Sequence, residues 1–198
     1  MRNHQASESV SIASSSGLAS WLREANISLA FTTYRANRLL LLGTDTTDKP
    51  QIKLHERLFD RPMGLFVAGE SLWMAARCQI WRLDNLLAPG QLHEGGDRLY
   101  VPAASFTTGE VNAHELVLDA DDQPIFVNTA FSCLATIKPR CSFAPTWAPP
   151  FITQFAGDDR CHLNGLALKD GLPTWATAFC SSGDPSSWRN QRSEGGVV

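Results

Sequence analysis

Five polar residues stand out in this chain because together they supply nitrogen and oxygen donors: His114, Glu115, Asn128, His162 and Asn164. Imidazole nitrogens, carboxylate oxygens and amide oxygens bind divalent metals, calcium among them, and they also hydrogen-bond polar ligands. None of the five belongs to a closely spaced motif such as His-Glu-x-x-His, so they form a site only where the fold brings distant segments together. The alternative is that each is an ordinary buried polar group, hydrogen-bonded to a neighbouring loop.

Nucleophilic catalysis has little support in the sequence. Cys161 directly precedes His162, and adjacent residues of a strand point to opposite faces, so the pair does not predict a thiol with its base. The charged run over residues 158–162 is interpreted as a tie between two structural units, with a clamp for a ligand as the alternative. The serine-rich stretch 181–188 is typical of an exposed loop.

The elements that must position these residues repeat along the chain. Three segments contain the same elements in the same order: a strand, a polar turn and a second strand with an aromatic residue. They are residues 61–75, 112–128 and 162–177. Such self-similarity at a period of about 50 residues indicates a repeat architecture. The aligned residues are Leu65, Leu116 and Leu166 on the first strands and Trp73, Phe126 and Trp175 on the second strands.

Further strands complete the repeat. A third strand is predicted over 79–83 and over 132–137, and an earlier partial unit, 28–33 followed by 38–43, supplies a second and a third strand. The predicted fold class is all-β, with β-propeller-like repeats of about 50 residues that form about four blades or partial blades. Propeller blades must stack because one blade cannot cover both faces of its sheet. A β-sandwich with coincidental spacing is the alternative.

We predict one β-propeller-like domain over residues 16–198, preceded by a disordered leader over residues 1–15, which is too polar to bury a core. A short N-terminal helix, capped by Ser16 and carrying Leu18 and Leu22 at helical spacing, is expected to pack on the sheets. Closed propellers have four to eight complete blades. The domain is therefore expected to be truncated at its C-terminus, with an exposed blade face and a sheet edge prone to association.

In a propeller, the first strand of each blade lines a central channel, and the loops that lead into these strands form a mouth on one face. The candidate residues of the first strands are His114, Glu115, His162 and Asn164, with Met63 at the same place in an earlier unit and Asn128 beside the second strand. We therefore expect these side chains to converge on the channel.

Composition limits the classes of partner and the cellular location that we expect. The 198 residues carry a formal net charge of -3 without a basic cluster, so nucleic acid is not expected as a partner. The chain has neither a secretory signal nor a run of 18 apolar residues, so no membrane association is expected. Five cysteines at scattered spacings indicate a reducing compartment, and the predicted location is the cytoplasm.

Several stretches resemble a bacterial conserved-hypothetical family that has a β-propeller-like domain of unknown function. They are residues 28–34, 61–65, 97–102, 126–129, 131–135 and 160–167. The resemblance spans nearly everything after residue 17. It implies a propeller-like fold and family members longer than this chain, and it implies no established activity.

More distantly, the chain is similar to calcium-dependent lactonases of the gluconolactonase and regucalcin type, which are also propellers. Asn164 matches the segment that bears their metal-binding asparagine, and His114-Glu115 stands where they carry an Asn-Asp pair. Met63 stands where a metal-binding glutamate is expected, and a thioether cannot replace a hard oxygen ligand. The resemblance therefore implies a calcium site at Asn164 with an incomplete ligand set.

Two functions remain open. The first is a non-catalytic scaffold that binds a small polar ligand or another protein on one face, since a propeller by itself implies no chemistry. The second is a metal-dependent, lactonase- or esterase-like hydrolase. In that reading a metal held by Asn164, His114 or His162 polarises a carbonyl and activates water.

Overall fold

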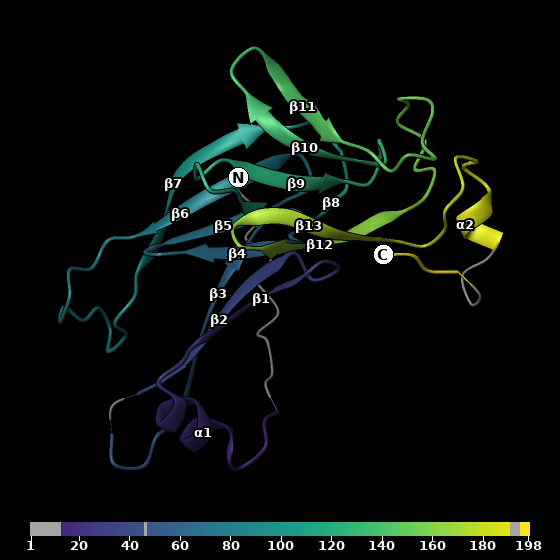
Figure 1. Ribbon diagram of the computed structural model, residues 1–198. Coiled ribbons are helices and arrows are strands. Elements are labelled where there is room, and N and C mark those ends of the chain that lie inside the picture. The colour runs from purple at the N-terminus through teal and green to yellow at the C-terminus, as the bar shows by residue number, and fades with distance from the viewer. Residues whose placement is uncertain (1–12, 46, 191–194) are drawn as a thin grey trace, which may run out of the picture.

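Short antiparallel strands dominate the structure, a computed structural model that describes residues 13–45, 47–190 and 195–198 (Figure 1). The strands form four sheets, and in each sheet the strands that are consecutive along the chain are neighbours. The protein is therefore mainly β, as the sequence predicts. The leader predicted over residues 1–15 lies outside the described part of the chain, except for residues 13–15.

The sheets contain three, four, four and two strands in chain order. The first consists of β1 (Leu29–Thr33), β2 (Arg38–Thr44) and β3 (Ile52–Leu58), and the second of β4 (Leu65–Ala68), β5 (Ser71–Ala75), β6 (Gln79–Asn85) and β7 (Tyr100–Thr107). The third consists of β8 (Ala113–Leu118), β9 (Pro124–Asn128), β10 (Cys133–Lys138) and β11 (Cys141–Trp147), and the fourth of β12 (Leu163–Lys169) and β13 (Leu172–Ala178). The helices are α1 (Leu18–Ala25) and α2 (Ser187–Asn190).

The predicted repeat is present as a repeated strand order. Leu65, Leu116 and Leu166 lie on β4, β8 and β12, the first strands of three units, and the predicted third strands are β6 and β10. The earlier partial unit is confirmed as well. Strand β1 contacts β4 as β5 contacts β8 and β9 contacts β12, which gives β1 the place of a second strand.

The predicted alignment of the aromatic residues is wrong by one position. Leu116 pairs with Phe126, whereas Leu166 pairs with Ala176 and not with Trp175. The second sheet shows the same offset. Because neighbouring residues of a strand point to opposite faces, the tryptophans do not occupy the place of Phe126 in their sheets. Alignment by residue type missed this offset because the turns between the paired strands differ in length.

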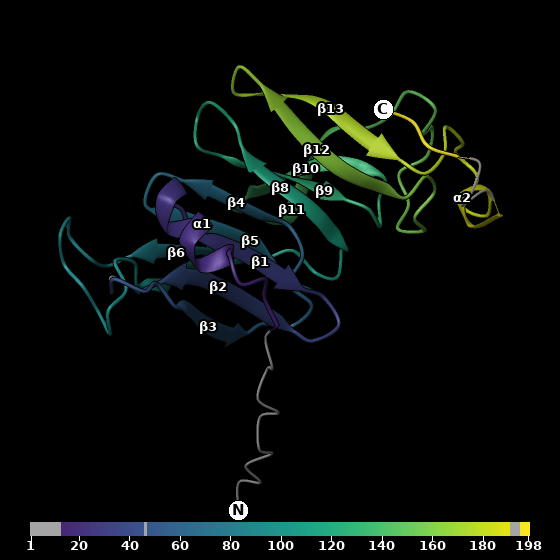
Figure 2. The ribbon, with the colours of Figure 1, turned by 90° about the horizontal axis from the view of Figure 1, so that it is seen from below.

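Neighbouring sheets pack through their first two strands, and the core lies between them (Figure 2). Leu116 and Phe126 of the third sheet and Leu163 of the fourth are essentially fully buried. Each such side chain stabilises the fold by about 1.5–3 kcal/mol. Gly64 lets the segment before β4 approach β8 closely, since a Cβ atom at this position would lie 2.7 Å from the Cα atom of Glu115.

Helix α1 packs on the first sheet through one apolar side. Leu22 is fully buried, and the helix contacts β2. The cap predicted at Ser16 is wrong, because Gly17 occupies the N-cap position and no side chain bonds to the first turn. Asn26 ends the helix in the left-handed conformation, which asparagine adopts more readily than most residues. No described helix has both the length and the apolar character needed to span a membrane.

Candidate functional site

A hollow of about 540 Å³ lies where several first strands begin. Its lining residues are Thr32, Tyr34, Pro62, Met63, Asn112, His114 and His162. They come from the end of β1 and from the segments that lead into β4, β8 and β12. Because β4 contacts β8 and β8 contacts β12, the segments leading into these strands meet at one end of the sheets.

His114, on β8, has one ring nitrogen already engaged. Its Nδ1 atom lies 2.9 Å from the carbonyl oxygen of Asn112 and 2.8 Å from Oγ1 of Thr129. The Thr129 hydroxyl donates its own proton to the carbonyl of Leu163 at 2.6 Å. Both neighbours of Nδ1 therefore accept, so Nδ1 carries the ring proton. Burial lowers the pKa of His114 below its ordinary value, which leaves the ring neutral at pH 7 with Nε2 unprotonated.

His162, directly before β12, is held from several sides. Its Nδ1 atom donates to Oδ2 of Asp159 at 2.8 Å. The Trp188 indole stacks on the ring with centroids 4.2 Å apart and donates from Nε1 to the Asp159 carbonyl at 2.7 Å, while Phe179 meets the ring edge-on. The backbone of His162 is left-handed, with φ at 49°. Such a conformation persists only where the surroundings enforce it, and these contacts do so.

The two imidazole rings lie side by side, with centroids 5.0 Å apart and an angle of 76° between their planes. In each ring Nδ1 is the engaged nitrogen, so Nε2 is the one left for a ligand. Neither Nε2 atom hydrogen-bonds to a residue that the structure describes. Metal-binding histidines are held in the same way: one ring nitrogen donates to a carbonyl or a carboxylate, and the other nitrogen binds the metal.

The other three predicted site residues lie outside the hollow. Asn128 is fully buried, and its Oδ1 atom accepts from the Phe131 N–H at 3.1 Å, so it shapes the turn after β9. Glu115 is half-buried and accepts from the Leu116 N–H, and burial raises its pKa. Asn164 lies on β12 and is partly exposed. The fold therefore brings His114 and His162 together, with Met63, and leaves these three apart.

Sequence reasoning missed the residues that line the hollow beside the histidines and those that orient the rings. They are Thr32, Tyr34, Pro62, Asn112, Thr129, Asp159 and Trp188. One of them had a local signal, because Asp159 precedes His162 by three residues in a tight charged run. Asn112 is also local, because it precedes His114 by two residues. The other five come from segments whose nearness to the histidines depends on the packing of the sheets.

The charged run 158–162 also ties structural units together, as the sequence predicts. The guanidinium of Arg160 pairs with both carboxylate oxygens of Asp158 at 2.9 and 2.7 Å and donates to the Gly183 carbonyl at 2.9 Å. Its backbone N–H donates to Oγ of Ser132 at 3.0 Å. The segment before β12 is thus joined to the turn before β10 and to the C-terminal residues.

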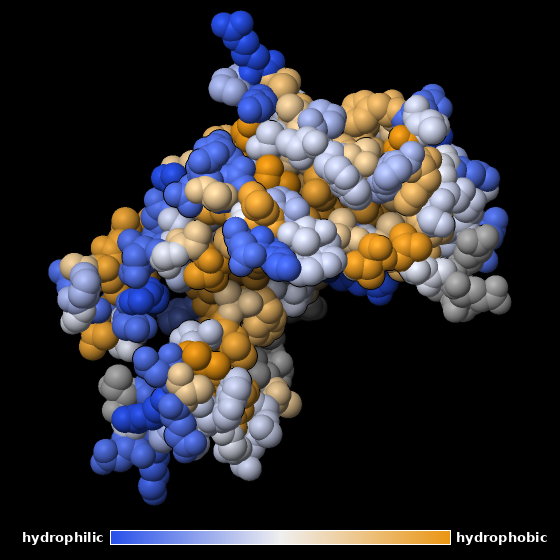
Figure 3. Space-filling model, viewed as in Figure 1, coloured by the Kyte–Doolittle hydropathy of each residue, from blue (hydrophilic) through white to orange (hydrophobic). Residues whose placement is uncertain are grey.

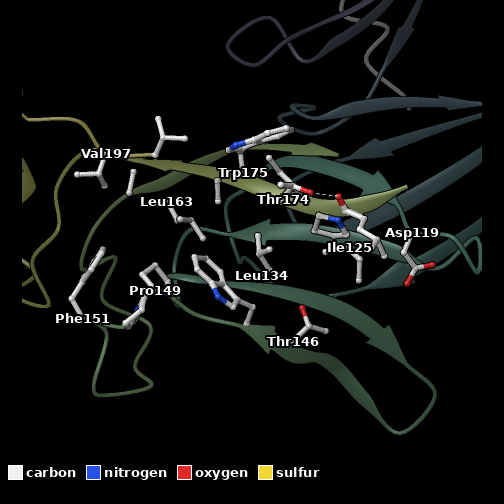
Figure 4. Close-up of a pocket in the computed structure, with 18 residues that line it drawn as sticks. Asp119, Ile125, Leu134, Thr146, Pro149, Phe151, Leu163, Thr174, Trp175 and Val197 are labelled. Carbon is white, nitrogen blue, oxygen red and sulfur yellow. Dashed lines mark hydrogen bonds between the residues drawn. The ribbon is translucent and has the colours of Figure 1, made fainter. Parts of the chain in front are cut away.

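A second hollow, an apolar groove of about 630 Å³, lies between the third and fourth sheets (Figure 4). Leu134 and Trp147 line it from the third sheet, and Leu163 and Trp175 from the fourth. Trp147 and Trp175 remain 45% and 46% exposed. An apolar face left this open is typical of an interaction site.

Comparison with models of known protein families gives a match over nearly the whole chain. The model of a family described as a domain of unknown function (DUF4915) matches residues 16–198. The matched range contains all the helices and strands described above and both histidines of the hollow. No curated protein matches the chain, so this comparison adds no support to the similarity with lactonases.

Proposed function

This chain belongs to the DUF4915 family, and we propose that it is a non-catalytic, β-propeller-like scaffold whose hollow at His114 and His162 binds a small polar ligand. The proposal has two parts. One concerns the arrangement of the sheets, and the other concerns the two ring nitrogens that a ligand would meet.

Repeated contacts between sheets support the propeller-like arrangement. Each first strand contacts the first strand of the next sheet from β4 to β12, and the second strands β5 and β9 contact the first strand that follows them. Antiparallel sheets of up to four strands in chain order are typical of propeller blades. A sandwich would instead pack two sheets face to face, whereas these four sheets follow one another in chain order (Figure 2).

The observation that carries the ligand proposal is that both histidines are hydrogen-bonded through Nδ1. Nδ1 of His114 donates to a carbonyl and a hydroxyl, and Nδ1 of His162 donates to a carboxylate. Nε2 is therefore the nitrogen that each ring presents to a ligand, and the neutral ring of His114 offers it as a hydrogen-bond acceptor. Such an acceptor favours a ligand with donor groups, such as a polyol, an amino sugar or an amine. The volume of about 540 Å³ is in the usual range for small-molecule sites.

A thermal melt of the full chain against a panel of polyols, amino sugars and amines tests this proposal, because a ligand that binds only the folded state raises the midpoint. We expect at least one compound to raise the midpoint of the wild type and to lose its effect in His114→Ala and in His162→Ala. His55→Ala is the matched control, since His55 is exposed on β3. The proposal is contradicted if every compound that stabilises the wild type raises the midpoint of both hollow variants by as much as it raises that of the wild type, because these compounds then bind elsewhere.

The spacing of the two rings favours a second candidate, a metal-dependent, lactonase- or esterase-like hydrolase. Two imidazoles bound through Nε2 to one tetrahedral zinc, at Zn–N distances of about 2.0–2.1 Å, have ring centres about 5 Å apart. The centroids here are 5.0 Å apart, and Asp159 is the kind of outer partner that zinc-binding histidines have. Within the described part of the chain no group of three or more His, Cys, Asp or Glu residues is arranged so that it could hold a metal ion, so water or substrate would complete the coordination of a metal held by the two rings.

In this second candidate function, the metal is bound by His114 and His162 and not by Asn164. Imidazole nitrogens suit zinc, whereas calcium prefers oxygen ligands. Such a metal, when bound, supplies a Lewis acid for a carbonyl and lowers the pKa of a bound water. A melt after chelation, repeated with calcium, magnesium, manganese and zinc, separates the candidates. A rise with zinc that disappears in His162→Ala, together with turnover of a lactone or ester, supports the hydrolase, and a melt that no metal changes supports the scaffold.

A further inference from the structure

The hollow at His114 and His162 contains an aromatic ring as well as the two imidazoles. Tyr34, in the turn after β1, lines the hollow and is 43% exposed. The Arg61 guanidinium lies over the Tyr34 ring, 5.7 Å from its centroid, and pairs with Glu110 at 3.1 Å. Arg61 thus fixes the ring from one side, and a ligand in the hollow can reach the exposed part of the ring.

The hollow has no formal charge of its own to offer a ligand. The described residues that line it include no Asp, Glu, Lys or Arg, and burial lowers the pKa of His114, which keeps that ring neutral. The ionised groups beside the hollow are engaged, since Asp159 accepts from the His162 ring and Glu110 pairs with Arg61. Because taking a charge out of water without a partner costs free energy, the hollow favours a neutral ligand.

One position of the repeat has a left-handed backbone in three units. Arg61, Asn112 and His162 each stand four residues before the aligned leucine of β4, β8 or β12, with φ at 46°, 54° and 49°. Glycine adopts this conformation without strain, whereas each of these residues carries a polar side chain. Asn112 and His162 line the hollow, and Arg61 holds Tyr34. Strained backbone positions of this kind cluster at ligand sites.

The side-chain amide of Asn112 is available to a ligand. The backbone carbonyl of Asn112 accepts from Nδ1 of His114 at 2.9 Å, but its amide group hydrogen-bonds to no residue that the structure describes. An amide both donates and accepts, and Nε2 of the neutral His114 ring accepts. This mixture of donors and acceptors matches hydroxyl groups, each of which also donates and accepts.

A pyranose combines the polar and apolar features that this hollow requires. Its hydroxyl groups stand around the edge of the ring, and its C–H groups form a less polar face. The face of an aromatic ring carries negative partial charge, which attracts such C–H groups. Tyr34, Pro62 and Met63 supply contacts for the C–H face, and Asn112 and His114 supply partners for the hydroxyl groups. A wholly apolar ligand has a better site in the groove between the third and fourth sheets, because Figure 3 shows apolar surface beside the C-terminal end of the chain, where that groove lies.

From these observations we infer that the hollow binds a neutral pyranose, with the sugar ring against Tyr34 and its hydroxyl groups hydrogen-bonded to Asn112 and to Nε2 of His114. The inference rests on the proposed ligand site and narrows its ligand to one class of sugar. An open-chain polyol lacks the C–H face, and an amine or an acid brings a charge, so these compounds should bind more weakly.

Saturation-transfer NMR on the full chain tests the inference. Sugars at high concentration also stabilise proteins by exclusion from their surface, so binding is measured directly and not by a melt. The probes are the methyl pyranosides of glucose, galactose and mannose. We expect at least one to bind, with the strongest saturation on its ring C–H protons. The affinity should fall about tenfold in Tyr34→Ala and stay within about twofold in Tyr34→Phe, which keeps the aromatic face.

Asn112→Gly separates a ligand contact from a backbone role. Glycine keeps the left-handed backbone and removes only the side chain, so the melting temperature should not fall, whereas the affinity should fall about tenfold. Asp122→Gly is the matched control. Asp122 is also left-handed, with φ at 58°, and lies in an exposed turn outside the hollow, so this variant should bind the glycoside as the wild type does.

A glycoside that binds Tyr34→Ala and Asn112→Gly as tightly as the wild type overturns the inference. Sorbitol, glucosamine and glucuronate, tested alongside, separate it from the proposed ligand site. If one of these three binds in a way that His114→Ala abolishes and no glycoside does, the inferred class of ligand is wrong although the hollow is a site. If no compound shows binding that His114→Ala weakens, the inference and the proposed site both fail.

Discussion

The Nδ1 atom of His162 lies 2.8 Å from Oδ2 of Asp159, three residues earlier in the chain. Trp188 covers this pair, since its ring stacks on the imidazole and its Nε1 donates to the Asp159 carbonyl. Helix α2, which contains Trp188, is thereby coupled to the segment before β12. The pair also decides which nitrogen of His162 a ligand meets.

Replacing Asp159 with Asn tests this coupling. The amide is a weaker acceptor than the carboxylate and releases the His162 ring from one tautomer, so the affinity for a ligand of the hollow should fall about tenfold. The free energy of unfolding should fall by about 1–2 kcal/mol. Calorimetric titration and a denaturant melt measure the two effects. Asp121→Asn, in an exposed turn, is the control, and an unchanged affinity in Asp159→Asn would contradict the positioning role.

The stability of the protein should depend on pH through His114. Burial lowers the pKa of its ring in the folded state below the ordinary value of 6.5, so the unfolded chain binds more protons between these two values. The stability that His114 contributes is present above pH 6.5 and is lost as the pH falls through its folded pKa. Glu115 acts with the opposite sign, because its raised pKa lowers stability as the pH rises from 4.5.

A comparison with His114→Gln isolates the contribution of the histidine. Urea melts of the variant and the wild type at several pH values should show a weaker loss of stability in acid for the variant. The groups that the ring faces, His162 and Asp159, are unchanged in both proteins. Parallel curves for the two proteins below pH 6.5 would show that His114 is not the titrating group.

Asn164→Ala should leave the hollow intact. Asn164 does not line it and is partly exposed, so ligand or metal affinity should stay within about twofold of the wild type. The free energy of unfolding should change by about 0.5 kcal/mol or less. The same titration and melt provide the measurement. A tenfold loss of metal affinity in this variant would instead support the calcium site that the lactonase resemblance implies.

Gly64→Ala should destabilise the contact between the second and third sheets. The added Cβ atom would lie 2.7 Å from the Cα atom of Glu115 and 2.9 Å from the backbone nitrogen of Leu116. Backbone atoms cannot move aside as a flexible side chain does, so we expect a loss of about 1–3 kcal/mol in a denaturant melt. Gly17→Ala, where a Cβ atom meets nothing within 4 Å, is the control and should cost much less.

Much of the strand order could be predicted because each strand carries its own signal. Apolar runs bounded by turn residues mark β4, β8 and β12, and the spacing of their leucines exposes the repeat. The register within a unit could not be predicted, because the turns between paired strands differ in length and because β8 with β9 and β12 with β13 pair with irregularities. Such irregularities depend on local backbone geometry, and residue type does not encode them directly.

The amino-acid sequence alone determined that this chain is mainly β, that its units recur about every 50 residues, and that His114 and His162 stand where first strands begin. These properties follow from local composition and spacing. Only the tertiary structure decided that the two histidines meet while Glu115, Asn128 and Asn164 do not. The direction of a side chain depends on strand register, on bulges and on the left-handed backbone at His162, and the packing of the sheets sets all three.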